Sequence, residues 1–204
     1  AGAATLILRD GFGLSGQAVT RTGDSDDALE LAGASASPLV ARSSGSPTLD
    51  LSTIGNTGHA SGIIGFETLS VTGGAWTLTG TQTAGGFTSA SFTAGSATLD
   101  SATLLMNGSA LTVGPSATLG VNGASALTGG LSLAGVLDMQ DGAAGDTLAV
   151  SGAFTGGGTV ALDVDFATNT ADQLQITGNV TGATTLAVTG LNSGAADGSD
   201  ISLV

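Results

Sequence analysis

One histidine, His59, is the sole side chain in this sequence that could act as a histidine general base, and the chain contains no cysteine. A Ser-His-Asp triad would need His59 beside an activated serine. The preceding Ser43, Ser44 and Ser46 lie in a Ser/Pro segment that lacks the Gly-Asp dipeptide of chymotrypsin-like nucleophile motifs. Without cysteine there are no disulfides, Cys-type zinc sites or thiol nucleophiles, and one histidine cannot form a metal-binding cluster. We therefore predict no catalytic residue and no enzyme activity, with a hydrolase kept only as a remote alternative.

Two glycine-containing motifs also fail to predict a site. Gly11, Gly13 and Gly16 satisfy the G-x-G-x-x-G pattern of dinucleotide-binding turns, but no helical pattern follows that could bind a pyrophosphate. Gly23-Asp24-Ser25 matches the opening of a GDS-type esterase, which needs a histidine near its C-terminus, and none follows His59. No cofactor is predicted.

Three carboxylates gather near the N-terminus, at Asp24, Asp26 and Asp27. They resemble one degenerate copy of a calcium-binding repeat, in which a Gly-rich nonapeptide recurs so that successive turns share ions. Aspartate at a turn more often accepts hydrogen bonds from its own backbone. We predict no metal site, and calcium binding by these three residues stays open.

The composition excludes several classes of partner. The 204 residues include 16 acidic residues, three arginines and no lysine, for a net charge of −13. That charge argues against nucleic-acid binding and against attraction to anionic membranes. No apolar run approaches the length of about 18 residues needed for a transmembrane helix, so no direct membrane insertion is expected. The 41% hydrophobic content and a mean hydropathy of +0.40 argue against disorder.

The elements of the chain are predicted to be short β-strands. Helical periodicity is nearly absent, while alternation of apolar with small or polar residues recurs between glycine-rich turns. The clearest alternating segments are 68–72, 75–79, 110–113, 159–164 and 173–177. Trp76 alternates with Leu78 and is predicted to be a core residue. Whether Phe87, Phe92, Phe154 and Phe166 form a stacked ladder or scattered plugs is left open.

The strands repeat at nearly regular intervals along the chain. Leu78, Leu99, Leu119 and Leu137 follow one another at similar spacings, and Leu131 follows Leu111 at the same kind of interval. A period of about 20 residues indicates a solenoid in which one aliphatic residue per strand forms an internal ladder and glycine forms the corners. We predict an all-β parallel solenoid of about ten coils, with an antiparallel sandwich as the competitor. Only two Asn-Gly pairs are available for the tight hairpins a sandwich would need.

The regularity of the repeat divides the chain into three parts. Residues 1–67 are predicted to be irregular N-terminal coils with loops, including loop-like segments within 38–62. Residues 68–141 are predicted to be regular coils. Residues 142–204 contain strands led by Asp146 and Asp172 and are predicted to be a modified cap, which a solenoid needs at its end.

The sequence resembles passenger domains of Gram-negative autotransporters, the proteins of type V secretion. The segment from Ile63 to Gly80, which reads IIGFETLSVTGGAWTLTG, is a phrase common in these domains. The later segments 145–152, 156–165, 171–174 and 178–182 resemble the C-terminal, pertactin-like autochaperone part of such passengers. The resemblance covers most of residues 63–204 and is weaker over 1–62.

The resemblance implies a right-handed parallel β-helix exported through the outer membrane to the bacterial cell surface. Its partner would be its own translocator β-barrel, expected outside this sequence, and its last coils would fold early and template the rest. The predicted function is a non-enzymatic stalk with a secretion-promoting autochaperone. The alternative is an adhesin that binds host cells, matrix or other bacteria. The ligand, any role in virulence, the oligomeric state and the role of the 38–62 loops stay open.

Overall fold

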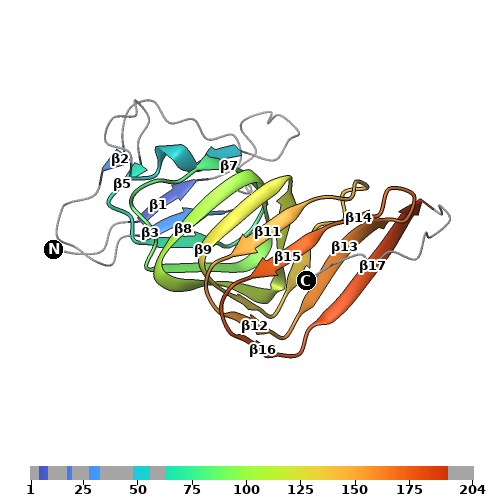
Figure 1. The fold of residues 1–204 in the computed structure, drawn as a ribbon. Helices are drawn as coiled ribbons and strands as arrows, with labels where there is room; N and C mark the ends of the chain where they lie inside the picture. Colours follow the sequence, from blue (N-terminus) through green and yellow to red (C-terminus); the bar gives the residue numbers. More distant parts are fainter. Residues whose placement is uncertain (1–4, 9–17, 20–27, 33–47, 56–62, 193–204) are drawn as a thin grey trace.

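The protein is a parallel β-solenoid of about six turns in a computed structural model (Figure 1). The structure describes residues 5–8, 18–19, 28–32, 48–55 and 63–192. Within these ranges the chain forms seventeen strands and one short 3-10 helix, η1 (Leu51–Thr53), and no α-helix. The predicted all-β parallel solenoid is confirmed, and the antiparallel sandwich is wrong, because all but one of the strand pairings are parallel.

Three walls enclose the solenoid interior, and each is a stack of parallel strands. We call them walls 1, 2 and 3. The long strands β8 (Ser89–Asn122) and β9 (Ala124–Leu133) bend around corners, so β8 contributes to all three walls and β9 to walls 1 and 2. Wall 1 is completed by β11 (Thr147–Val150) and β15 (Gln173–Ile176). Wall 2 also contains β1 (Thr5–Leu8), β3 (Ala28–Leu31), β6 (Thr68–Val71), β12 (Phe154–Gly156) and β16 (Val180–Gly182). Wall 3 also contains β4 (Thr48–Asp50), β7 (Ala75–Thr81), β10 (Val136–Asp138), β13 (Thr159–Asp165) and β17 (Thr185–Asn192).

Two small features stand beside these walls. Strands β2 (Ala18–Val19) and β5 (Ile63–Ile64) form a separate parallel pair. Strand β14 (Thr170–Ala171) folds back antiparallel on the end of β13.

The register confirms most of the predicted leucine ladder. Leu78 pairs with Leu99, Leu111 with Leu131, and Leu119 with Leu137. The step from Leu99 differs, because Gly120 lies against the Thr98 side chain and Gly123 against that of Ser101. Both contacts join residues with the same separation along the chain. The same separation from Leu99 leads to Val121, so Val121 lies beside Leu99 and Leu119 does not. The prediction of one continuous Leu78-to-Leu137 ladder is therefore wrong at that step.

The number of residues per coil is not constant. The sequence-based prediction of about ten coils is therefore too high. The shortest coil lies in the middle of the chain, where β8 pairs with β10, and the coils lengthen from the β9–β11 pair to the β11–β15 pair. Near the N-terminus Ala28 pairs with Thr68, which makes that coil about twice as long as its neighbours. Each coil must close three walls, but its connections can lengthen at the surface without disturbing the stack. The described residues therefore form fewer and larger coils than a period of about 20 residues predicts.

The core is aliphatic, with a few rings placed separately. Trp76 is 1% exposed, and its indole N–H donates to the carbonyl oxygen of Gly73 at 3.1 Å, which confirms its prediction as a core residue. Phe87 pairs with Met106, and Phe154 pairs with Leu131, so these buried rings do not stack on one another. Phe166 is exposed. Phe87, Phe92 and Phe154 are therefore scattered plugs in the core, and Phe92 pairs with Val71.

Corner glycines allow successive coils to approach closely. Gly95 has φ +77°, and a Cβ at this position would contact the backbone of Gly73 and Gly74 in the preceding coil. A positive φ is costly for other residues, and the close approach leaves no space for a side chain. The predicted use of glycine at the corners is confirmed here.

Candidate functional site

The C-terminal end of the described solenoid leaves apolar side chains uncovered. Strands β15, β16 and β17 form the last rung of the three walls, and no described strand pairs with their outer edges. Val180 is 60% exposed, and Leu186 and Val188 are each 47% exposed. Most other large apolar side chains of the walls are buried. At the last rung, apolar side chains of the described solenoid are therefore accessible to solvent.

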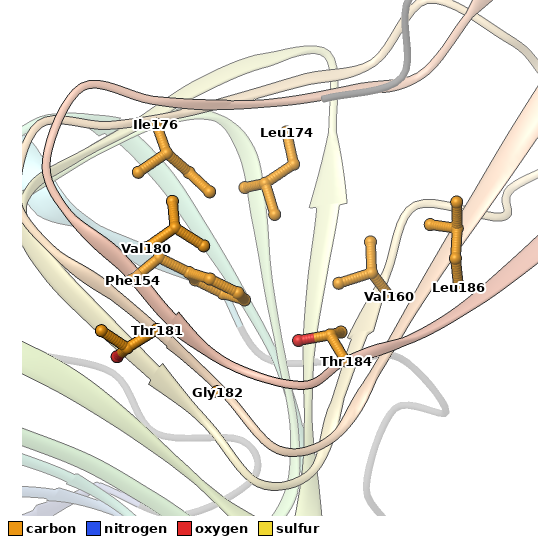
Figure 2. A pocket seen from close by; sticks show the side chains of 9 residues that line it. All are labelled: Phe154, Val160, Leu174, Ile176, Val180, Thr181, Gly182, Thr184 and Leu186. Atoms are coloured by element: carbon orange, nitrogen blue, oxygen red, sulfur yellow. The ribbon is translucent and has the colours of Figure 1, made fainter.

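Side chains from all three walls converge on a cavity at this end (Figure 2). Its volume is about 240 Å³. Leu174 and Ile176 come from β15, Val180 from β16, and Leu186 from β17, with Phe154 of the preceding coil below. We call this cavity the apolar end. Its lining contains no ionisable side chain, so it can hold apolar groups but offers no acid, base or metal ligand of its own.

Three buried aspartates lie together where wall 3 meets wall 1. We call Asp146, Asp163 and Asp172 the carboxylate corner; they are 8%, 1% and 0% exposed. Asp172 is the centre of the group. Its Oδ1 accepts from the backbone N–H groups of Gly145 and Asp146 at 2.9 and 3.0 Å, and its Oδ2 accepts from the N–H of Asp163 at 2.7 Å. One carboxylate thus joins the corner of one coil to a strand in wall 3.

The other two carboxylates extend the same pattern toward the N-terminus. Asp146 Oδ1 accepts from the N–H of Gly123 at 2.8 Å, one coil earlier, and Asp163 Oδ2 accepts from the N–H of Gly142 at 2.8 Å. Backbone N–H groups at this corner cannot all be satisfied by strand pairing, since the chain turns between walls. The aspartates supply the missing acceptors, which makes the corner a stack of charge-assisted hydrogen bonds between coils.

Burial makes the carboxyl groups of Asp146 and Asp172 harder to ionise. It raises the pKa of Asp146, and the N–H bond from Gly123 offsets this in part, while the charges of Asp141, Asp172 and Asp163 raise that pKa further. Burial likewise raises the pKa of Asp172, against the three N–H groups that favour its charged form. Asp146 Oδ2 is buried and accepts no hydrogen bond. Among the described residues no group of three or more His, Asp or Glu side chains has the geometry to hold a metal ion.

A different carboxylate marks the end of wall 3. Asn192 Nδ2 donates to Asp165 Oδ2 at 2.8 Å, and this bond lowers the pKa of the partly exposed Asp165. The two residues are register partners at the end of the β13–β17 pairing, where a β-bulge after Val164 adds one position to β17. The bulge sets the register with which the chain leaves the last described strand.

Most of the residues singled out in the sequence lie outside the described residues. This applies to the possible calcium ligands Asp24, Asp26 and Asp27, to His59, and to the serine segment. It also applies to the glycines of the dinucleotide-type motif. Part of the 38–62 interval is described: residues 48–55 form β4, η1 and a bridge from Ile54 to Ile63, so this part belongs to the coils. These earlier candidates therefore stay predictions.

The carboxylate corner was not predicted as a group. Asp146 and Asp172 were recognised only as residues that precede strands, and Asp163 as part of an alternating strand. A signal was present, because Asp146 and Asp172 both stand directly before an apolar alternation and lie one local coil length apart. Asp163 carried no such signal, because it lies inside an alternating strand and its contacts come from Gly142 in the connection 139–146 and from Asp172.

Comparison with known proteins gives a partial match. A stretch of 56 residues, 26% of this chain, is 46% identical to the probable autotransporter YfaL of Escherichia coli K12. The match spans about 4% of the length of that protein. No family model and no solved structure matches the chain. The partial match and the parallel β-solenoid together fit a segment of an autotransporter passenger domain, which confirms the family resemblance found in the sequence.

Proposed function

We propose that this chain is a non-enzymatic stalk segment of an autotransporter passenger, whose residues 142–204 act as an autochaperone cap. Residues 1–67 would form irregular N-terminal coils and residues 68–141 the regular stalk. The cap would fold early and provide a finished rung on which the preceding coils pair.

The observation that carries the proposal is the extent of contact across residue 142. In each wall a strand of the C-terminal part pairs with one from the preceding part: β11 and β12 with β9, and β13 with β10. The bond from Gly123 to the Asp146 carboxylate adds a partly buried charge-assisted link between the two parts. In a solenoid, stability is the sum of intrinsic coil terms and interfaces with nearest neighbours. An early-formed rung with three edges would therefore lower the cost of adding the next coil.

Export follows from the family similarity. Similarity to an autotransporter indicates passage through the outer membrane to the cell surface. We propose that the partner in this passage is the protein's own translocator barrel. In the part of the chain that the structure describes, no helix is long and apolar enough to cross a membrane.

Truncation tests the autochaperone role. Removal of residues 142–204 should lower the urea midpoint of the remaining chain far more than removal of residues 1–62. Refolding from urea should also slow, and adding the separate 142–204 fragment should restore part of the rate. Equal losses of stability from the two truncations, with no rescue by the added fragment, would contradict the proposal. No feature of the described residues specifically supports the adhesin or hydrolase alternatives.

A further inference from the structure

The two Asn-Gly pairs of the sequence both lie at corners of the solenoid, but in different surroundings. Asn107 and Gly108 lie within β8 between wall 1 and wall 2, whereas Asn122 and Gly123 join β8 to β9 between wall 3 and wall 1. Asparagine followed by glycine is prone to spontaneous deamidation, because glycine has no side chain to obstruct its backbone nitrogen. The contacts around each pair therefore decide how fast the reaction runs there.

Deamidation at such a pair consumes only water and releases ammonia. Solvent base takes the proton of the glycine N–H, and the nitrogen attacks the side-chain carbonyl carbon of the preceding asparagine. A C–N bond forms, ammonia leaves, and a cyclic succinimide remains. Water then opens the ring at either carbonyl carbon, which gives aspartate or isoaspartate. Any contact that holds the glycine N–H in place, or disfavours loss of its proton, therefore slows the reaction.

The corner at Asn107 leaves this reaction free to proceed. Asn107 and Gly108 are both exposed, and they lie where the pairing of β8 with β9 is interrupted. Between the pairs that Leu105 and Ala110 make with β9, β8 contains more residues than β9 does. Apart from its chain neighbours, no described residue has an atom within 4 Å of the place that a Cβ on Gly108 would take. The Gly108 nitrogen thus has room to turn toward the Asn107 side chain.

Gly123, in contrast, is held by the coils on both sides. Its N–H donates to Asp146 Oδ1 at 2.8 Å, and its carbonyl oxygen accepts from the N–H of Thr147 at 3.1 Å. On the other side, a Cβ on Gly123 would meet the hydroxyl oxygen of Ser101 in the preceding coil. The carboxylate also disfavours loss of the Gly123 proton, because a second negative charge would form beside it. Attack on the Asn122 side chain must therefore first break the bond to Asp146.

We propose that Asn107 is a site of spontaneous deamidation in the folded protein, and that Asp146, which binds the N–H of Gly123, protects Asn122 from the same reaction. Loss of one hydrogen bond to a charged group corresponds to a factor of about ten or more in rate, so position 107 should convert at least about tenfold faster than position 122. This inference does not rest on the proposed function, because it uses only the local contacts of the two pairs.

Peptide mass spectrometry of the full chain, incubated in mildly alkaline buffer, measures both conversions. Digestion with pepsin in acid gives the peptides, and protein isoaspartyl methyltransferase quantifies the isoaspartate. In urea that unfolds the chain, the two positions should convert at similar rates, because glycine follows both asparagines. Equal rates in the folded chain, or faster conversion at position 122, would overturn the proposal. The same rate ratio in urea as in the folded chain would also overturn it, since the folded contacts would then cause no difference.

Asp146→Ala tests the protecting contact. It should raise the rate at position 122 by a factor of about ten or more and leave the rate at position 107 unchanged. The control Asp141→Ala removes a nearby exposed carboxylate that accepts from Ala143, and should change neither rate. Asp146→Asn keeps an acceptor oxygen without the charge, so it should raise the rate at position 122 by a smaller factor and serves where circular dichroism shows that Asp146→Ala is unfolded. An unchanged rate at position 122 in a folded variant would refute the role of Asp146.

Discussion

Asp172→Ala removes the central acceptor of the carboxylate corner and tests whether this corner holds the C-terminal coils together. The Asp172 carboxylate accepts three backbone N–H groups, from Gly145, Asp146 and Asp163. Alanine accepts none of them, and the change leaves the backbone path unaltered. The strand pairs β11–β15 and β13–β17 stay available, so the variant should still form the solenoid.

The expected loss follows from which of the three N–H groups water can reach. Gly145 is exposed, so its N–H can be solvated when the carboxylate is removed. Asp146 and Asp163 are buried, and an unsatisfied buried N–H costs about 1–3 kcal/mol. Two such groups cost about 2–6 kcal/mol, and relief from burying the Asp172 charge reduces the total. We expect Asp172→Ala to lower the free energy of unfolding of the C-terminal coils by about 1–4 kcal/mol.

Two matched variants separate the hydrogen bonds from other effects. Asp172→Asn keeps one acceptor oxygen and presents an amide donor to the remaining N–H, so it should lose about half as much as Asp172→Ala. Asp141→Ala removes a nearby exposed carboxylate that accepts only from the N–H of Ala143, and should cost less than about 1 kcal/mol.

Local stability is best measured by hydrogen exchange, because coils of a solenoid need not unfold together. Exchange detected by mass spectrometry should accelerate in peptides containing the amides of Asp146 and Asp163. The fluorescence of Trp76, the only tryptophan, reports on β7 in the N-terminal half and should change little in the early part of a urea titration. Unchanged exchange at Asp146 and Asp163 in Asp172→Ala, with an unchanged urea midpoint, would refute the reasoning.

Two further predictions concern pH and coil spacing. Because burial raises the pKa of Asp146 and of Asp172 above the ordinary value of 3.8, their contribution to stability is full below that value and is lost as pH rises through their folded pKa values, so the urea midpoint should be higher at pH 4 than at pH 7. The lowered pKa of Asp165 affects stability only below the ordinary value of that carboxyl group, so it does not produce the difference between pH 4 and pH 7. Asp146→Asn should reduce the rise of the urea midpoint at pH 4. A rise of full size in that variant would argue against Asp146 as one of its sources. Gly158→Ala places a Cβ against the backbone of Gly135 in the preceding coil, while Gly157→Ala meets only the Leu133 carbonyl oxygen at 3.2 Å. Gly158→Ala should cost about 1–3 kcal/mol in thermal or urea unfolding and Gly157→Ala clearly less, so equal melting temperatures of the two variants would contradict the close approach.

Alternation and spacing were enough to predict the architecture of this chain. In a parallel stack, equivalent positions of successive coils lie side by side. A leucine that recurs after one coil length therefore packs beside the earlier leucine, as Leu78 with Leu99 and Leu111 with Leu131 show. The same logic placed Trp76 in the core, because it alternates with Leu78 on one strand. These inferences held because period-two alternation assigns each side chain to the inside or the outside of a wall before any wall is assembled.

Three features depended on how the connections between strands fold. They are the number of coils, the position of Val121 instead of Leu119 beside Leu99, and the carboxylate corner. Connection length varies without a clear mark in the sequence, and one extra residue at a corner changes which residues meet in the next coil. Asp146, Asp163 and Asp172 come from three points of the chain, and each is buried and accepts a hydrogen bond from backbone of the preceding coil. The sequence thus specifies which side chains face the interior, since that is a local property of each strand. The contacts between coils set the register and the polar network, since both arise from residues a full coil apart along the chain that only the closed stack brings together.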